Sequence, residues 1–289
     1  MDGWIILDKD SGLFSRTASS RVARMFGTKK SGHIGTLDPM ATGVLPIALG
    51  GATKMIPFIE ELSDGNKEYL FSVQFGFLTD TLDITGNITD RNDVVPNDDE
   101  IKSVLGKYIG GYSQVPPQYS SIHVNGAHAY SLARAGKNAD LKPRKILIHE
   151  LEYLGRRGES WHFRVVCGRG TYVRSLARDI GADMGLFATV DMIRRTHTNG
   201  FDIKNAVKLD FLEKVFNNNG ALDEYLMPVD YGLGDIPVCN LSDKDAVLYK
   251  NGGFIEMVAH DSRVRVYNNG EFIGIGVIDR NKLRPVRTI

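Results

Sequence analysis

The stretch that decides the fold of this chain is glycine-rich: Gly32-His33-Ile34-Gly35-Thr36-Leu37-Asp38-Pro39-Met40-Ala41-Thr42-Gly43-Val44-Leu45-Pro46. Its first part is typical of a loop, and the apolar segment at 44–49 is expected to be buried. An aspartate before a proline is by itself a common loop element, because Asp accepts hydrogen bonds from nearby N–H groups. A catalytic carboxylate must also stay ionised in a shielded place, which requires a cation as partner. The spacing alone favours the loop interpretation and leaves the catalytic one open.

Composition outside this stretch is that of a folded globular protein, with 289 residues, 42% hydrophobic and 24% charged. No apolar run reaches the roughly eighteen residues that span a membrane. The N-terminus carries an acid, Asp2, where a signal peptide needs a base. Cys167 and Cys239 are too far apart in sequence for a disulfide framework or a metal motif. We therefore expect a soluble, cytoplasmic protein.

Charge is balanced in total but uneven along the chain, with 35 basic and 35 acidic residues. Residues 60–102 contain eleven acids and three bases, whereas residues 142–195 contain eleven bases and six acids. Binding to an RNA backbone requires a basic face and not a basic total. Charge alone still favours ordinary solvated surfaces.

Hydrophobic periodicity predicts alternating strands and helices over the first 234 residues and a small β-rich domain over residues 235–289. Expected strands are 4–9, 69–77, 146–154, 161–167, 237–241, 263–267 and 272–279, the last after an Asn268-Asn269-Gly270 hairpin turn. Expected helices are 16–26, 96–108, 127–135, 172–184 and 209–216. Residues 114–145 have little regular pattern and are interpreted as a surface insertion.

Several common catalytic signatures are absent from the sequence. It has no GxxxxGK[ST], no GxGxxG opening a helix, no HExxH, no GxSxG and no CxxC. This removes the P-loop ATPase, dinucleotide-binding, zinc-protease and α/β-hydrolase interpretations.

The quoted stretch, continued to Gly50-Gly51-Ala52-Thr53-Lys54, closely resembles the signature segment of the TruB family of tRNA pseudouridine synthases. More than twenty positions in strict order make the match highly specific. Further segments agree: Ile6-Leu7-Asp8-Lys9, Lys67-Glu68-Tyr69, Thr79-Asp80-Thr81-Leu82-Asp83-Ile84-Thr85-Gly86, Pro116 to Arg134, Gly170 to Leu176, and Phe272 to Gly276. Two positions depart from the family pattern, Asp10 in place of a proline and His123 in place of a lysine.

The resemblance implies an α+β pseudouridine-synthase fold, with a mixed, mainly antiparallel sheet and flanking helices. The C-terminal domain would resemble the small PUA-like RNA-binding module, and residues 114–145 the RNA-gripping insertion. The implied activity is that of an isomerase, which converts uridine 55 in the T-loop of tRNA to pseudouridine. That reaction involves no redox change, so no cofactor or metal is expected. The implied partner is the T-arm of tRNA, bound by a monomer without a guide RNA or protein partner.

The resemblance also implies a set of site residues. Asp38 would be the catalytic carboxylate and Arg174 its ion-pair partner. Tyr69 would stack on the flipped uracil and serve in proton transfer, with Tyr172 and Ile193 in support. The RNA contacts implied are His33, Lys9, Arg144, Lys145, Lys282 and Arg284, and the basic residue Arg287 is a further phosphate contact by hypothesis.

Two alternatives remain open from the sequence. One is an RNA-folding protein that remodels tRNA beside or instead of catalysis. The other is a guide-RNA-dependent relative, which shares the catalytic core but carries extra terminal segments for which 289 residues leave little room. Whether Asp38 attacks the sugar or abstracts its 2′ proton is also open.

Overall fold

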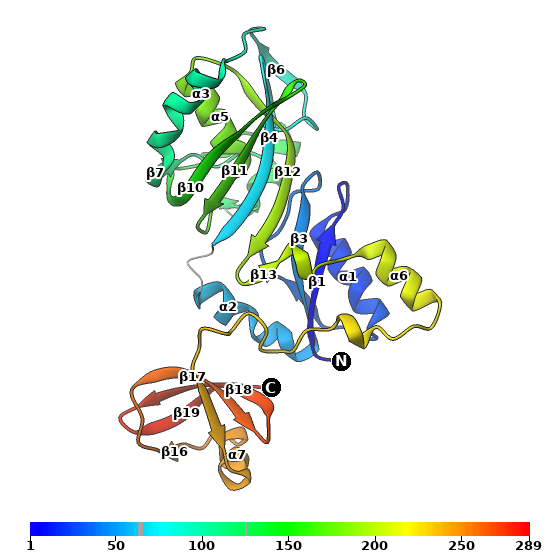
Figure 1. The fold of residues 1–289 in the computed structure, drawn as a ribbon, viewed down its shortest axis with the longest axis vertical. Coiled ribbons are helices and arrows are strands. Elements are labelled where there is room, and N and C mark those ends of the chain that lie inside the picture. The colour runs from blue at the N-terminus through cyan, green and yellow to red at the C-terminus, as the bar shows by residue number, and fades with distance from the viewer. Residues whose placement is uncertain (63–65, 125) are drawn as a thin grey trace.

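The computed structural model of the chain describes residues 1–62, 66–124 and 126–289, and a ten-stranded sheet is its largest element there. The strands of this sheet are β1 (Gly3–Lys9), β2 (Ser31–His33), β3 (Thr42–Leu49), β4 (Lys67–Phe75), β7 (Gly110–Gln114), β10 (Arg144–Arg157), β11 (Ser160–Cys167), β12 (Ala188–Thr198), β13 (Phe201–Asp202) and β14 (Val207–Lys208). Their main order is β14-β1-β3-β12-β4-β11-β10-β7 (Figure 1), with β2 beside β3 and β13 beside β12. The pairs β1–β14 and β3–β12 are parallel and the other pairs are antiparallel. The expected mixed, mainly antiparallel sheet is therefore confirmed.

One face of the sheet is covered by helices. These are α1 (Ser15–Met25), α3 (Asp98–Leu105), α5 (Val173–Asp183) and α6 (Leu209–Asn217). Their apolar side chains share one core with the inward side chains of β1, β3, β4, β11 and β12. Helix α5 packs against β12, one of the central strands of the sheet.

Strand alternation gives β1 two buried faces. Ile5 and Leu7 point into the helical core, whereas Trp4 and Ile6 belong to a second core on the other side. The second core also contains side chains of α2 (Ile56–Leu62) and, from the C-terminal domain, Ile275. The C-terminal domain is thus packed against the α2 side of the main sheet.

The C-terminal domain has its own sheet and its own core. It consists of β15 (Val238–Leu241), α7 (Asp243–Lys250), β16 (Ile255–Glu256), β17 (Ser262–Asn268), β18 (Glu271–Asp279) and β19 (Lys282–Thr288), in the strand order β15-β17-β18-β19-β16. Strands β17 and β18 form the expected hairpin, and Asn269 and Gly270 in its turn both have positive φ. This curled sheet agrees with the expected PUA-like module.

The surface insertion also contains the short helix that the sequence predicts. A hairpin of β8 (His123–Val124) and β9 (Ala127–His128) leads into α4 (Ala129–Arg134). At the end of the molecule away from the C-terminal domain lies a second hairpin, of β5 (Phe77–Thr79) and β6 (Ile88–Arg91) (Figure 1).

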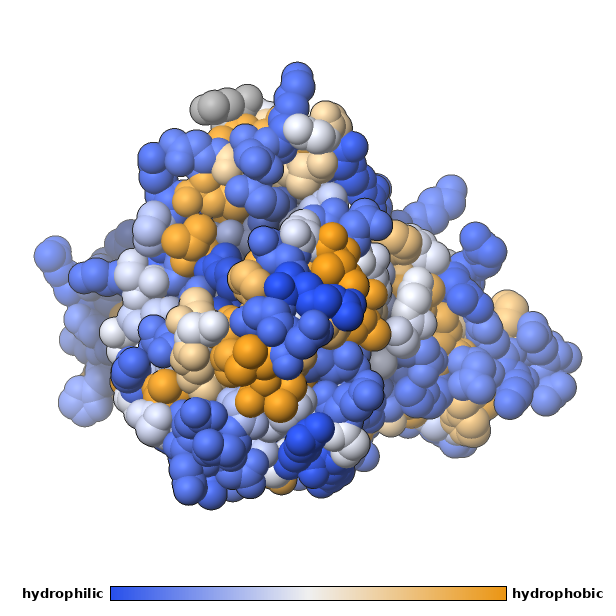
Figure 2. All heavy atoms as spheres, turned by 90° about the horizontal axis from the view of Figure 1, so that it is seen from above, coloured by the Kyte–Doolittle hydropathy of each residue, from blue (hydrophilic) through white to orange (hydrophobic). Residues whose placement is uncertain are grey.

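The surface seen from above is mainly hydrophilic, with apolar residues in separate patches (Figure 2). Four apolar side chains on the segment that carries β6 are 49–52% exposed: Ile84, Ile88, Val94 and Val95. No helix in the described ranges is long and apolar enough to cross a membrane.

Candidate active site

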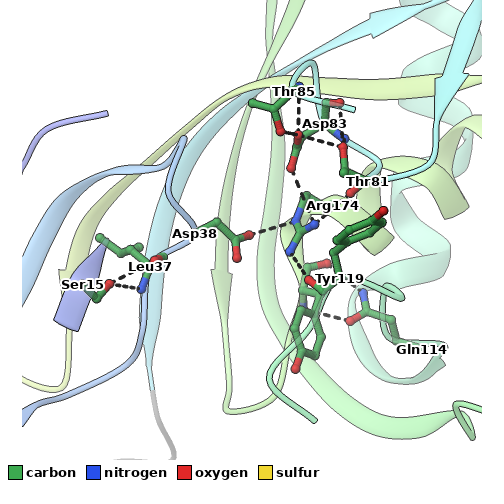
Figure 3. Close-up of polar contacts among 10 residues, drawn as sticks. Ser15, Leu37, Asp38, Thr81, Asp83, Thr85, Gln114, Tyr119 and Arg174 are labelled. Atoms are coloured by element: carbon green, nitrogen blue, oxygen red, sulfur yellow. Dashed lines mark hydrogen bonds and ion pairs between the residues drawn. The ribbon is translucent and has the colours of Figure 1, made fainter. Parts of the chain in front are cut away.

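Asp38 lies on the loop between β2 and β3, and neighbouring elements fix the backbone of this loop. The Ser15 hydroxyl, at the start of α1, donates to the Leu37 carbonyl and accepts from the Leu37 N–H, both at 3.0 Å (Figure 3). The Pro39 carbonyl accepts from the Gly12 N–H at 2.8 Å and from the Lys9 ammonium at 3.1 Å. With its flanking residues held in this way, the Asp38 side chain starts from a fixed position.

Arg174 is the second residue of α5, and its guanidinium faces Asp38. Its Nε lies 2.8 Å from Oδ2 of Asp38, and the two side chains point toward one another (Figure 3). Its Nη1 donates to the Thr81 carbonyl at 2.8 Å and its Nη2 to the Tyr119 carbonyl at 2.9 Å. The Arg174 side chain is 4% exposed and that of Asp38 is 36% exposed. A rigid buried cation therefore presents a partly open carboxylate.

Asp83 lies on the opposite side of Arg174, with its Oδ2 3.5 Å from Nη1 (Figure 3). Its other oxygen, Oδ1, accepts from the Thr81 hydroxyl at 2.9 Å and the Thr85 N–H at 3.0 Å. The loop that carries it includes Leu82 with φ of 64°, a backbone conformation unfavourable for a branched apolar residue. The quoted TDTLDITG segment therefore serves to hold a second carboxylate against Arg174, a role that the sequence reasoning missed.

Burial raises the pKa of Asp38 above its ordinary value, and this effect is larger than the opposing effect of Arg174. Asp83 raises the pKa of Asp38 further by repulsion, and Lys9 lowers it. Within the described residues, Arg174 makes the single ion pair of this carboxylate, and its Oδ1 has no hydrogen bond. A carboxylate with one paired oxygen and one available oxygen is suited to act as a nucleophile or base.

The other residues expected at the site lie on the adjacent strands β4 and β12 and just before α5. Tyr69 on β4 is 8% exposed and lies between Val165 of β11 and Arg195 of β12 in the sheet. Burial raises the pKa of Tyr69, and the nearby Arg195 opposes that effect. Ile193 is 4% exposed and belongs to the same core as Tyr69.

Tyr172 immediately precedes α5 and is positioned by Gln114 of β7. The Tyr172 N–H donates to the Gln114 side-chain oxygen at 2.9 Å, and the Gln114 amide donates to the Tyr172 carbonyl at 3.2 Å. Gln114 itself is 1% exposed. Burial raises the pKa of Tyr172. The charge of Arg144 lowers this pKa, and the charge of Asp38 raises it. The start of α5 and the edge of the insertion are thus locked together.

Lys9 differs from the expectation that it contacts RNA. It is fully buried, and its ammonium donates to the carbonyls of Asp10, Leu13 and Pro39 at 2.9, 2.8 and 3.1 Å. Burial lowers the pKa of Lys9 to about 8. All three of its protons are used to hold loops in place, which argues against a direct contact with RNA. Its neighbour Asp10, at the usual proline position, pairs with Lys208 at 2.6 Å.

The remaining expected RNA contacts lie nearer the surface. His33 is half-buried, and its Nε2 is 3.2 Å from the Thr36 hydroxyl. Arg144 and Lys145 at the start of β10 are exposed, as are Arg284 and Arg287 on β19. Lys282 lies over the Phe254 ring at 4.7 Å. These side chains are distributed between the edge of the catalytic half and the C-terminal domain.

His123, the residue at the usual lysine position, belongs to a column of flat side chains in the insertion. Its ring centroid is 3.8 Å from that of His128, which lies 5.1 Å from the stacked ring of Tyr130. The Arg134 guanidinium lies over the Tyr130 ring, with its Cζ 5.8 Å from the ring centroid. The insertion therefore presents π faces where the family pattern has an ammonium group.

No group of three potential metal-ligating His, Cys, Asp or Glu side chains occurs in the described ranges. The chemistry that the arrangement does support is that of one available carboxylate beside a fixed guanidinium and a buried phenol.

Comparison with known proteins gives a consistent result along the chain. The family model "TruB family pseudouridylate synthase (N terminal domain)" matches residues 23–173. The model "tRNA pseudouridylate synthase B C-terminal domain" matches residues 174–234, and "Pseudouridine synthase II TruB, C-terminal" matches residues 237–289.

Curated relatives are similar over nearly the whole chain. A protein named tRNA pseudouridine synthase B from Caulobacter sp. (strain K31) is 43% identical over 259 residues, 89% of this chain and 82% of its own length. One of the same name from Dinoroseobacter shibae is 38% identical over 292 residues, 99% of this chain and 95% of its own length.

Among solved structures, an H/ACA ribonucleoprotein bound to a substrate RNA contains a chain that aligns with a TM-score of 0.71. The alignment is 22% identical and covers 99% of this chain and 84% of that one, which shows a shared fold. Family models, relatives and fold agree, and this chain belongs to the TruB family of pseudouridine synthases.

Proposed function

We propose that this pseudouridine synthase isomerises the T-loop uridine of tRNA, with Asp38 as the catalytic carboxylate. Its curated relatives carry the name tRNA pseudouridine synthase B, so tRNA is the substrate class. The observation that carries the assignment to Asp38 is its single ion pair, 2.8 Å long, with the almost fully buried Arg174. The Arg174 guanidinium opposes the rise in the pKa of Asp38 that burial causes, and so favours the charged carboxylate.

The reaction matches the groups that are available. The C1′–N1 bond breaks, the uracil turns, and C5 bonds to C1′, so that C5 loses a proton and N1 gains one. No electron acceptor and no energy source is consumed. Asp38 starts this sequence at the ribose, either by attack on the sugar or by removal of the 2′ proton. Tyr69 stacks on the uracil and moves protons; the support for this role is that Tyr69 is a buried phenol close enough to Asp38 for their charges to interact.

The target base must leave its stack to reach Asp38, which costs on the order of a few kcal/mol. Contacts to phosphate groups offset this cost, and a folded loop is recognised by its shape and by unstacked bases. Exposed Arg144 and Lys145 of the catalytic half support such contacts, as do Arg284 and Arg287. Half-buried His33, beside the Asp38 loop, supports a role in holding the flipped conformation.

The division of labour that we propose has three parts. Residues 1–234 carry the catalysis, the insertion at 114–145 grips the T-arm, and residues 235–289 add RNA affinity. The insertion's column of His123, His128 and Tyr130 supports a stacking contact with the RNA. The protein acts as a cytoplasmic monomer, without a guide RNA or protein partner.

The test is to incubate the purified protein alone with an unmodified tRNA transcript and to map pseudouridine along the product. The proposal predicts one modified position, in the T-loop, and none in a transcript whose T-loop uridine is replaced by cytidine. Binding and refolding of the transcript without any product would instead support a purely RNA-remodelling protein. Activity that appears only after addition of a second RNA would support a guide-dependent enzyme.

A further inference from the structure

Arg195 on β12 is a fully buried arginine that no expectation assigned a role. A buried guanidinium normally has a carboxylate partner, because removing its charge from water is unfavourable. In the described ranges, no Asp or Glu lies within ion-pair distance of Arg195. Its charge is therefore uncompensated by any direct partner, directly beneath the loop that carries Asp38.

Two of its nitrogens hold both ends of that loop. The Arg195 Nε donates to the Val44 carbonyl at 2.8 Å, and Nη2 donates to the Gly35 carbonyl at 2.7 Å. Asp38 lies between these two points in the chain. The hydrogen bonds explain where the guanidinium is fixed, but they use only two of its three nitrogens.

Two glycines of the signature stretch leave room for this arginine. A Cβ at Gly35, which has φ of +64°, would lie 2.8 Å from the Arg195 Nη1. A Cβ at Gly43, which has φ of +101°, would lie 2.1 Å from the Arg195 carbonyl oxygen. The loop is thus built around Arg195 and not merely beside it.

The third nitrogen, Nη1, is buried and has no hydrogen-bond acceptor in the described part of the chain. An unpaired buried donor is unfavourable unless some state of the protein provides an acceptor. Tyr69 is the direct cross-strand partner of Arg195. The positive charge of the guanidinium favours the phenolate form of Tyr69, which opposes the rise in the pKa of Tyr69 caused by burial.

We propose that Arg195 is a positioning residue for proton transfer by Tyr69, whose transient phenolate its uncompensated charge stabilises. This inference rests on the proposed function. Tyr69 gives its proton to the uracil as C1′–N1 breaks, and it takes a proton from C5 after C1′–C5 has formed. The net result moves one proton from C5 to N1 and leaves Tyr69 unchanged, so the phenolate exists only between the two steps.

The charged and titratable groups around this pair come from several elements. Those that act on Tyr69 are Asp38, Cys167 and Arg195. Besides that of Tyr69, the charge of Arg195 shifts the pKa of four other groups: Lys9, His33, Lys67 and Cys167. Arg195 lowers the pKa values of Lys9, His33 and Lys67, so one buried charge influences three basic groups near the loop.

The test is a double-mutant cycle between Arg195→Gln and Tyr69→Phe, measured as single-turnover rates at saturating tRNA. Glutamine removes the charge but can still donate to a loop carbonyl. We expect Arg195→Gln to slow the step by about 100-fold while the Kd for tRNA changes by less than about threefold. The double variant should be no slower than Tyr69→Phe alone. Effects that multiply in the double variant would overturn the proposal.

Arg195→Lys separates charge from the attachment of the loop, since lysine keeps the charge but cannot bond both carbonyls in the same geometry. A rate within about tenfold of wild type supports the proposal, and a rate as low as that of Arg195→Gln contradicts it. If Arg195→Gln does not fold, an Arg195→Lys rate about 100-fold or more below wild type contradicts the proposal.

A readout independent of activity is the pH titration of the Tyr69 ring carbon by NMR, assigned with Tyr69→Phe. Arg195→Gln should move this titration to higher pH than in Arg195→Lys, and equal titrations would overturn the proposal. If the wild-type protein forms no pseudouridine, the proposed function fails, but this titration still tests the coupling of Arg195 to Tyr69.

Discussion

At the scale of single residues, the N–H groups of the Arg174 guanidinium set the arrangement of the site. One side of its guanidinium faces Asp38 and the other faces Asp83, while two backbone carbonyls fix its plane. Only a planar group with several donors in a fixed geometry satisfies these partners at once. The position of the Asp38 carboxylate thus depends on the shape of Arg174 as well as on its charge.

Replacement of Arg174 by lysine keeps the charge and removes this geometry. We expect Arg174→Lys to lower the single-turnover rate by about 100-fold or more, because Asp38 loses its fixed partner. The affinity for tRNA should change little, since Arg174 is almost fully buried. Rapid-quench kinetics and filter binding measure the two quantities separately. An Arg174→Lys protein with an unchanged rate would show that charge alone suffices.

The dependence of the rate on pH follows from the raised pKa of Asp38. In the proposed mechanism, the ionised form of Asp38 attacks the sugar or takes the 2′ proton, so we expect the rate to fall as pH drops through this raised pKa. The acidic limb of the single-turnover profile should therefore lie above the ordinary carboxyl value of 3.8. The folded chain also holds the Asp38 proton more tightly than the unfolded chain. The contribution of Asp38 to the free energy of unfolding therefore decreases as pH rises from the unfolded pKa of this group to its raised folded pKa. An acidic limb at or below the ordinary value would contradict the account.

The ion pair of Asp38 with Arg174, which the resemblance implies, is present in the structure, whereas the burial of Lys9 and Arg195 was not predicted. The resemblance brought together Asp38, Arg174 and Tyr69, which the structure gathers around one point. Lys9 and Arg195 look like surface charges in the sequence, but both are fully buried. Their acceptors are carbonyl groups far along the chain, and no local pattern encodes such partners.

At the scale of elements, β12 joins the two parts of the main sheet. It pairs with β3 on one side and with β4 on the other. The sequence did not predict this strand. Its neighbour β4 was predicted from clear alternation, whereas its other neighbour, β3, was expected only as a buried apolar segment. Register shifts between Val190 and Met192 and between Arg195 and His197 disturb the period of two, and charged residues follow one another. A central strand with bulges therefore lacks the pattern on which sequence-based prediction depends.

The contact between β12 and β3 predicts a large effect of Gly43→Ala. The new Cβ would lie 2.1 Å from the Arg195 carbonyl oxygen at a φ of +101°. We expect a loss of more than about 3 kcal/mol in the free energy of unfolding, measured by urea denaturation. Gly158→Ala is the matched control, because Gly158 has φ of +63° and no atom within 4 Å of the new Cβ. It should cost only about 1–2 kcal/mol, and equal losses in the two variants would contradict the account.

At the scale of the whole molecule, both apolar and polar contacts hold the C-terminal domain against the part of the chain that precedes residue 235. Ile275 enters the core that contains Trp4 and Ile6. The Lys54 ammonium donates to the Thr288 carbonyl at 3.0 Å, and Arg263 pairs with Glu61 at 2.9 Å. The β-rich texture of this domain was predicted from turn residues, whereas its docking depends on side chains from distant segments.

The domain's basic side chains predict how RNA binding depends on salt. Replacement of Lys282, Arg284 and Arg287 by alanine together should weaken tRNA binding and reduce the slope of log K against log salt by up to about 3, roughly one for each lost phosphate contact. Filter binding over a range of potassium chloride concentrations measures this slope. An unaltered slope would show that these three side chains do not contact phosphate groups.

Pseudouridine mapping tests whether Asp38 catalyses the isomerisation of the T-loop uridine. An unmodified tRNA transcript is incubated with the wild-type protein and, separately, with Asp38→Asn. The account predicts one modified T-loop uridine with the wild-type protein. With Asp38→Asn it predicts a rate lower by at least about 1,000-fold and tRNA affinity within a few-fold of wild type. A fully active Asp38→Asn protein, or a wild-type protein that binds tRNA but forms no pseudouridine, would contradict it.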